Sequence, residues 1–319
     1  MRSARGLRMA DYSTILDPEY IDEDAGYEMQ TPRTLFLTHG HVFGPDRDGA
    51  IGNLPQMPVN TALLYGHTHV KANEPCSENK IDKFELAKVG QATEHNYCGV
   101  NCGFMDQFAS VFGKAGSLIR LDCRSLEYQY FPFHPEGYRL VLMDSVVKHE
   151  LASSAYNKRR QSCEAAVAAI QKKHPHVEFL RDCTMAMLEE AKADISAEDY
   201  MRAEYVIEEI QRVLDVCEAL EKDDYETVGK KMYETHHGMS KLYEVSCEEL
   251  DFLNDCAKEY GVTGSRVMGG GFGGCTINLV KDELYDNFVE KTKAAFKAKF
   301  GRSPKVYDVV IGDGSRRLE

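Results

Sequence analysis

The segment RVMGGGFGGCTINLV, residues 266–280, places five glycines in the six positions from Gly269 to Gly274 and continues into an apolar run that begins at Cys275. It satisfies the pattern G-x-G-x-x-G by letter, but a dinucleotide-binding loop leaves a strand and opens a helix. Here the residues that follow, 276–280, predict a strand. Two interpretations stay open. Either the bare backbone approaches a phosphate or another substrate group, or the glycines form a tight turn with positive φ between a helix and a strand.

Periodic patterns predict the elements on both sides of this loop. Ser246 and Glu249 form a capping-box pattern at the start of one helix, and Gly261 suits the position after its end. Strands, then a helical block, then alternating strands and helices predict an α+β architecture. The predicted strands are 34–38, 61–65, 118–121, 126–133, 138–143, 276–280 and 305–310, and the predicted helices are 157–173, 197–221, 223–237, 246–260 and 282–299.

The composition excludes several classes of function. The 319 residues, about two domains in length, include 38 Lys and Arg against 51 Asp and Glu, a net charge of −13. Such a chain poorly matches a nucleic-acid backbone or an anionic membrane surface. No apolar run reaches the ~20 residues that span a bilayer, and no signal peptide is predicted. The ten cysteines are scattered, and Cys98 with Cys102 lacks a second ligand pair for zinc, so we expect reduced thiols and a cytoplasmic location.

A carboxylate at position 106 is the second candidate for a functional group. Asp106 stands among the apolar residues Phe104, Met105 and Phe108. A carboxylate in such surroundings is either a helix cap or a group whose pKa the environment alters for function. The pattern alone leaves both interpretations open.

Four segments, in order, resemble galactokinases, a family of the GHMP small-molecule kinases. Together they make the resemblance specific over residues 80–319. The resemblance implies a GHMP kinase fold, in which the three strands between Leu118 and Met143 share one sheet. The segments are EHNYCGVNCGFMDQF at 94–108, LDCRSLE at 121–127, YNKRR at 156–160 and RVMGGGFGGCT at 266–276.

The resemblance implies phosphoryl transfer from Mg²⁺-bound ATP to the C1 hydroxyl of galactose, by a cytoplasmic and monomeric enzyme with a sugar and ATP as its small-molecule partners. Asp106 matches the family's catalytic aspartate, which accepts the proton of the C1 hydroxyl or orients that group. Gly103 and Tyr156 match positions that contact the sugar. The glycines that match the family's third signature are Gly269, Gly270, Gly271, Gly273 and Gly274.

Two other signatures of the family are missing from the sequence. One resembles G-R-x-N-x-I-G-E-H-x-D and supplies an arginine and sugar ligands; the other, of the type G-L-S-S-S-A, wraps the phosphates of ATP. Residues 64–69, LYGHTH, echo the first without its acidic residues. We therefore expect little or no turnover. The alternative from another class is a non-catalytic remnant, chimeric or truncated, that binds sugar weakly or pairs with another chain.

Residues 8–76 resemble the C-terminal half of a calcineurin-like metallophosphoesterase. In that family the histidines matching His39, His67 and His69 bind two metal ions, and imidazole suits Mn²⁺ or Zn²⁺. The family's earlier segments, with the bridging carboxylate, are absent, which argues against a metal here and against a metal-dependent phosphodiesterase. Three surface histidines in a β-rich fragment are the alternative. The predicted domains are this fragment (1–78), the remainder of a GHMP kinase N-terminal domain (79–145) and its C-terminal domain (146–319).

Overall fold

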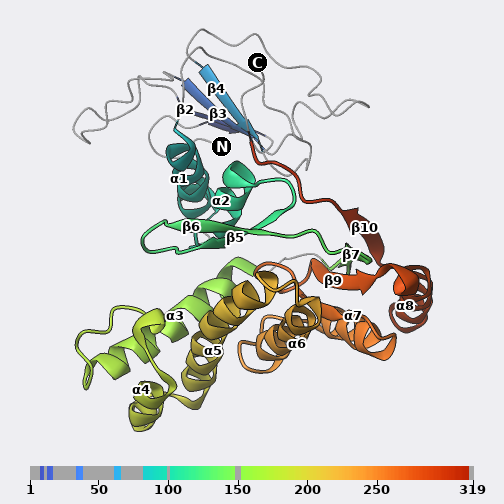
Figure 1. Ribbon diagram of the computed structural model, residues 1–319. Helices are drawn as coiled ribbons and strands as arrows, with labels where there is room; N and C mark the ends of the chain where they lie inside the picture. Colours follow the sequence, from blue (N-terminus) through green and yellow to red (C-terminus); the bar gives the residue numbers. More distant parts are fainter. Residues whose placement is uncertain are drawn as a thin grey trace. The chain divides into compact units, whose positions relative to one another are not determined.

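A computed structural model (Figure 1) describes residues 8–10, 13–16, 34–38, 61–65, 82–98, 101–147 and 152–315. These residues divide into two compact units. The larger unit contains residues 90–106 and the described part of 113–312, and the smaller one contains the described residues up to Val89 together with 107–112 and 313–315. The three predicted domains, 1–78, 79–145 and 146–319, stay a prediction.

The smaller unit contains a four-stranded sheet in the order β1-β2-β3-β4. Its strands are β1 (Arg8–Ala10), β2 (Ser13–Leu16), β3 (Thr34–Thr38) and β4 (Thr61–Tyr65). The first three are antiparallel and β3 pairs in parallel with β4. The two strands predicted at 34–38 and 61–65 are thus confirmed. In the same unit Phe84, from α1 (Lys83–Thr93), packs against Phe112, from α2 (Met105–Phe112), with ring centres 4.6 Å apart.

The larger unit is built on an antiparallel sheet in the order β10-β7-β9-β8. Its strands are β7 (Tyr138–Asp144), β8 (Gly264–Val267), β9 (Cys275–Lys281) and β10 (Lys305–Val309). Val267 of β8 lies opposite Thr276 of β9, so the glycine segment is the loop of a hairpin. The expectation of a turn between a helix and a strand is wrong on this point, because β8 is a strand that periodicity did not predict.

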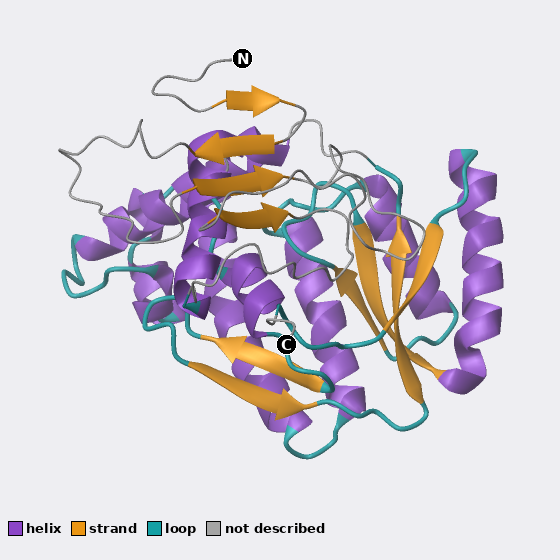
Figure 2. Ribbon diagram, turned by 90° about the horizontal axis from the view of Figure 1, so that it is seen from above, coloured by secondary structure: helices purple, strands orange, loops and turns teal. Residues whose placement is uncertain are grey.

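The strands β5 (Ser117–Leu121) and β6 (Tyr128–Pro132) form a two-stranded sheet. This sheet is separate from the β10-β7-β9-β8 sheet (Figure 2). The expectation that the three strands between Leu118 and Met143 share one sheet is therefore wrong. The turn before β7 contains Gly137 in the left-handed region (φ 74°). It redirects the chain so that β7 pairs with β9 and β10 instead.

Helix α5 lies beside both α3 and α6 (Figure 1). Side-chain caps precede α5 and α6. The Ser196 hydroxyl accepts a hydrogen bond from Asp199 N at 3.0 Å before α5, and Asp224 does the same for Thr227 N before α6. Such caps satisfy amides that have no partner within the helix. The helices of this unit are α3 (Ala152–Gln171), α4 (Met185–Glu190), α5 (Ala197–Leu220), α6 (Tyr225–Lys241), α7 (Glu248–Glu259) and α8 (Tyr285–Phe300).

The start of α7 differs from the predicted capping box. Its N-cap is Cys247, which makes no side-chain cap. Ser246 instead hydrogen-bonds Asp251, and Glu249 pairs with Arg302 at 2.8 Å, so both predicted partners are engaged elsewhere. The end of the helix is as predicted. Gly261 adopts φ 75°, and the Val262 amide donates to Ala257 O at 2.9 Å, the bond of a Schellman motif.

Helices cover both faces of the β10-β7-β9-β8 sheet. Alternate side chains of each strand point to opposite faces, so both faces can contribute to a core. Val280 of β9 packs toward α7 and α8, with Leu253 and Phe296, whereas its neighbour Leu279 packs toward α6, with Val228. On the α6 face, Gly229 lies so close to β8 that an added Cβ would be 2.1 Å from Thr263 O. The glycine therefore sets how closely helix and sheet approach.

A contact between His236 and Asp251 joins α6 to α7. The side chain of His236 is 5% exposed, and its Nε2 lies 3.3 Å from Asp251 Oδ1. The Ser240 hydroxyl also donates to Asp251 at 2.7 Å. Burial by itself would raise the pKa of Asp251, but the hydrogen bonds from His236, Ser246 and Ser240 outweigh it and hold this pKa well below its ordinary value of 3.8.

We predict that Asp251→Asn lowers the free energy of unfolding by about 1–3 kcal/mol at pH 7, because it leaves buried donors without a charged acceptor. A carboxylate with a depressed folded-state pKa stabilises above its unfolded pKa, and this contribution disappears as the pH falls. The deficit should therefore shrink below about pH 4. Urea unfolding at pH 7 and pH 3 measures it, with the exposed Asp255→Asn on the same helix as control. An equal deficit at both pH values would contradict this assignment.

Candidate functional site

Asp106 is the second residue of α2. It therefore lies inside the first helical turn, and the interpretation of Asp106 as the cap residue before a helix does not fit these bounds. Its side chain is exposed. The position thus suits a side chain that accepts a proton or a hydrogen bond from a ligand.

Helix α3 holds the segment that leads to Asp106. The Gly103 amide donates a hydrogen bond to the Tyr156 hydroxyl. One residue along α3, Asn157 Oδ1 accepts from Asn101 N at 3.3 Å, and one turn further Arg160 donates to Asn101 O at 3.3 Å. Residues four apart share a face of a helix, so a single turn of α3 makes all three contacts.

The chain at 91–95 also binds this segment, through the carbonyl of Cys102. His95 Nε2 lies 2.9 Å from Cys102 O, and the Gln91 amide donates to the same oxygen at 3.3 Å. Residues 101–103 are therefore bound along their backbone by α3 and by the chain at 91–95. This arrangement fixes the chain three residues before Asp106.

The glycine loop has a backbone that most residues cannot adopt. Positive φ occurs at Gly269, Gly271, Gly273 and Gly274, and also at Phe272. A Cβ on Gly271 would lie 2.0 Å from Val245 O, so a side chain there is excluded by contact as well as by φ. At the end of the loop, the Ser145 amide and hydroxyl both donate to Gly274 O, at 2.9 and 2.7 Å.

The ring of Tyr156 connects this loop to the segment of Asp106. A Cβ on Gly270 would be 3.7 Å from the ring, in ordinary contact, while the hydroxyl at the other end of the side chain accepts from Gly103. Burial raises the pKa of Tyr156, the amide of Gly103 opposes this, and the charge of Asp106 raises it further. The structure thus brings together Gly103, Asp106, Tyr156 and the glycine loop, which the sequence had placed up to 170 residues apart.

Several residues at the site were missed by sequence reasoning. Asn101, Asn157 and Arg160 stand inside quoted motifs, but their letters alone do not indicate backbone clamps. Val146, Glu244 and Phe272 adopt positive φ without being glycine, a strained backbone that often accompanies function. No sequence signal reports such strain. The histidines of the other resemblance, His39, His67 and His69, lie outside the described residues.

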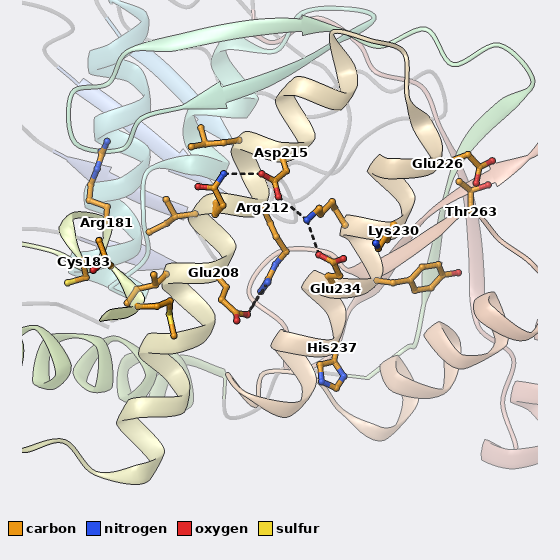
Figure 3. A pocket seen from close by; sticks show the side chains of 18 residues that line it. Arg181, Cys183, Glu208, Arg212, Asp215, Glu226, Lys230, Glu234, His237 and Thr263 are labelled. Atoms are coloured by element: carbon orange, nitrogen blue, oxygen red, sulfur yellow. Dashed lines mark hydrogen bonds and ion pairs between the residues drawn. The ribbon is translucent and has the colours of Figure 1, made fainter. Parts of the chain in front are cut away.

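A hollow lies elsewhere, along α5 and α6 (Figure 3). Its volume is about 1240 Å³, and no sequence-predicted site residue lines it. Two cations that line the hollow pair with acids that also line it: Arg212 with Glu208 at 3.2 Å, and Lys231 with Asp215 at 2.8 Å. These pairs compensate part of the charge within the hollow itself.

The described part of the chain contains no group of three His, Cys, Asp or Glu side chains able to hold a metal ion. None of its helices is long and apolar enough to cross a membrane. Its eight cysteines, from Cys102 to Cys275, are free thiols.

Comparison with known proteins identifies the family. The model of the GHMP kinase N-terminal domain matches residues 68–114, and that of the C-terminal domain matches residues 216–298. The chain is 38% identical to the galactokinase of Thermotoga petrophila over 286 residues, 89% of this chain and 79% of that one. The galactokinase of Thermotoga maritima is 40% identical with the same coverage. That of Clostridium beijerinckii is 42% identical over 240 residues, 75% of this chain and 61% of the other.

The Thermotoga alignments bear on the N-terminal resemblance. Only 240 of the 319 residues lie from Lys80 onward, so an alignment over 89% of the chain must include residues before Lys80. It therefore reaches the region that resembles metallophosphoesterases, and that interpretation gains no support.

A solved structure agrees with these sequence matches. The galactokinase of Lactococcus lactis, in complex with galactose, superposes with a TM-score of 0.71 at 30% sequence identity. The match covers 75% of this chain and 62% of the Lactococcus protein, so the chain spans somewhat less than two thirds of that relative. The fold is thus a GHMP kinase fold of the α+β class, and the chain belongs to the galactokinase family of GHMP kinases.

Proposed function

We propose that this chain binds galactose beside Asp106 and directs the transfer of the γ-phosphoryl group of ATP to the C1 hydroxyl of the sugar. The observation that carries the proposal is the junction at Tyr156. There, one side chain contacts both the segment of Asp106 and the glycine loop. Family membership supplies the reaction class, and the Lactococcus relative was solved with galactose.

In this reaction the C1 oxygen forms a bond to phosphorus while the bond from phosphorus to the bridging oxygen of ADP breaks. The proton of the C1 hydroxyl passes to the Asp106 carboxylate, or that carboxylate orients the hydroxyl as a hydrogen-bond acceptor. The exposed carboxylate at the start of α2 is accessible for this role. The Tyr156 hydroxyl would position a sugar hydroxyl next to it.

ATP would enter with Mg²⁺, which neutralises phosphate charge when bound. Among the described residues no group of three His, Cys, Asp or Glu side chains could hold this ion. The glycine loop exposes backbone instead: Gly269 and Gly270 are exposed, and a Cβ on Gly269 would meet nothing within 4 Å. This bare surface supports close approach of a substrate.

We propose further that the protein acts in the cytoplasm as a monomer, with a sugar and ATP as its ligands. The free thiols of the described cysteines support the reducing compartment. A remnant that binds sugar without transferring phosphate is the second candidate. The sequence observation that favours it is the absence of the phosphate-wrapping and arginine-bearing signatures.

We predict that Asp106→Asn weakens galactose binding by about 1.5–3 kcal/mol, the worth of a hydrogen bond to a charged group. Its effect on the melting temperature should be small, because the side chain is exposed. Titration calorimetry with galactose measures the loss. The matched control is Asp286→Asn, since Asp286 is the exposed second residue of α8, as Asp106 is of α2. Identical isotherms for wild type and Asp106→Asn would remove Asp106 from the site.

We also predict a galactose-dependent release of ADP that is slower than the usual kinase range of about 1–100 s⁻¹, because phosphoryl transfer depends on charge stabilisation that the missing signatures would supply. A coupled ADP assay measures it, beside a phosphodiester assay with Mn²⁺. Turnover within the usual range would show that the missing signatures are dispensable. If neither ADP release nor galactose binding is detected, the proposed function is wrong.

A further inference from the structure

The turn between α6 and α7 is held by an arginine from α3. Arg159 Nε donates to Tyr243 O and its Nη2 donates to Glu244 O, both at 2.6 Å. These carbonyls follow the C-terminus of α6, where backbone acceptors have no partner within the helix. Glu244 has φ 53°, a left-handed conformation that costs energy for a residue with a side chain. Two charge-assisted hydrogen bonds on either side of its peptide offset this cost.

The next carbonyl of the same turn holds the glycine loop. The Phe272 amide donates to Val245 O at 2.6 Å, and Gly271 packs so tightly on this oxygen that a Cβ would lie 2.0 Å from it. Phe272 is itself in the left-handed region, with φ 61°. The strained centre of the loop therefore rests on a backbone position directly after the two that Arg159 binds.

Arg159 also contacts the loop directly. The centre of its guanidinium lies 5.7 Å from the centre of the Phe272 ring, within the range of a cation–π interaction. Burial is the main cause that lowers the pKa of Arg159, with the nearby charge of Arg202 adding to it. A half-buried planar guanidinium that binds two carbonyls and lies over a ring has no equivalent in lysine, which offers one compact ammonium group.

We propose that Arg159 is a positioning residue of the site: it fixes the 243–245 turn and, through Val245 O and the Phe272 ring, the conformation of the glycine loop that Tyr156 contacts. The proposal deepens the proposed function, on which its relevance to sugar binding rests. Arg159 sits three residues after Tyr156 on α3, so one turn of this helix organises the Asp106 segment, the tyrosine and the glycine loop. Arg159 is not assigned a contact with substrate.

The test compares wild type with Arg159→Ala, Arg159→Lys and the control Arg139→Ala, whose arginine lies on β7 and forms a half-exposed ion pair with Asp282. The main readout is hydrogen exchange at the Phe272 amide, which is independent of catalysis. We expect exchange roughly tenfold faster in Arg159→Ala, as for the loss of a net hydrogen-bond contribution. Arg159→Lys should show a smaller increase, Arg139→Ala should match wild type, and added methylguanidinium should slow exchange again in Arg159→Ala.

Galactose titration gives the second readout, with a roughly tenfold weaker affinity expected for Arg159→Ala. Unchanged exchange at Phe272 in both Arg159 variants overturns the positioning role. A uniform increase of exchange over the whole larger unit, without rescue by methylguanidinium, also overturns it, because it indicates general destabilisation. If Arg159→Ala does not fold, Arg159→Lys decides the question. If wild type binds no galactose while the exchange results hold, the proposed function fails and the positioning of the loop stands.

Discussion

The side chain of Tyr156 is the contact on which the site depends. Its hydroxyl accepts the amide of Gly103, and its ring lies against Gly270. The hydroxyl thus contacts the segment that leads into α2, and the ring contacts the hairpin loop between β8 and β9. A rigid ring suits this role, because two torsions fix the whole side chain and little conformational entropy is lost on ordering it.

The neighbours of Tyr156 on α3 extend this organisation to backbone groups on both sides. Asn157 and Arg160 bind Asn101, whereas Arg159 binds the turn that supports the loop. Hydrogen bonds to backbone are insensitive to which side chains occur at the bound positions. A site built this way fixes the direction of the chain, and Asp106 and the backbone of Gly269 and Gly270 are exposed at its surface.

Strained backbone conformations occur in and beside the glycine loop. The non-glycine residues Val146, Glu244 and Phe272, all with positive φ, flank or form it. Each has a compensating bond nearby: Val146 N donates to Asp144 Oδ1 at 2.7 Å, Glu244 O accepts from Arg159, and Phe272 N donates to Val245 O. Strain of this kind persists only where the surrounding structure determines it. The hollow along α5 and α6 shows no such concentration, although it is large.

Local patterns determined much of this protein. Helical periodicity predicted α5 to α8 closely, because long amphipathic segments report their period directly. The motifs also pointed to Gly103, Asp106, Tyr156 and the glycines. What the letters could not contain is pairing and strain. Strand β8 is too short to show a periodic pattern, and the residues of β9 that pair with β7 lie more than 130 residues away in sequence. The predicted capping box at Ser246 does not form, because Ser246 hydrogen-bonds Asp251 instead. That Arg159 binds two carbonyls and Tyr156 bridges two segments was decided only by tertiary structure, since hydrogen bonds to backbone leave no trace in the residues that accept them.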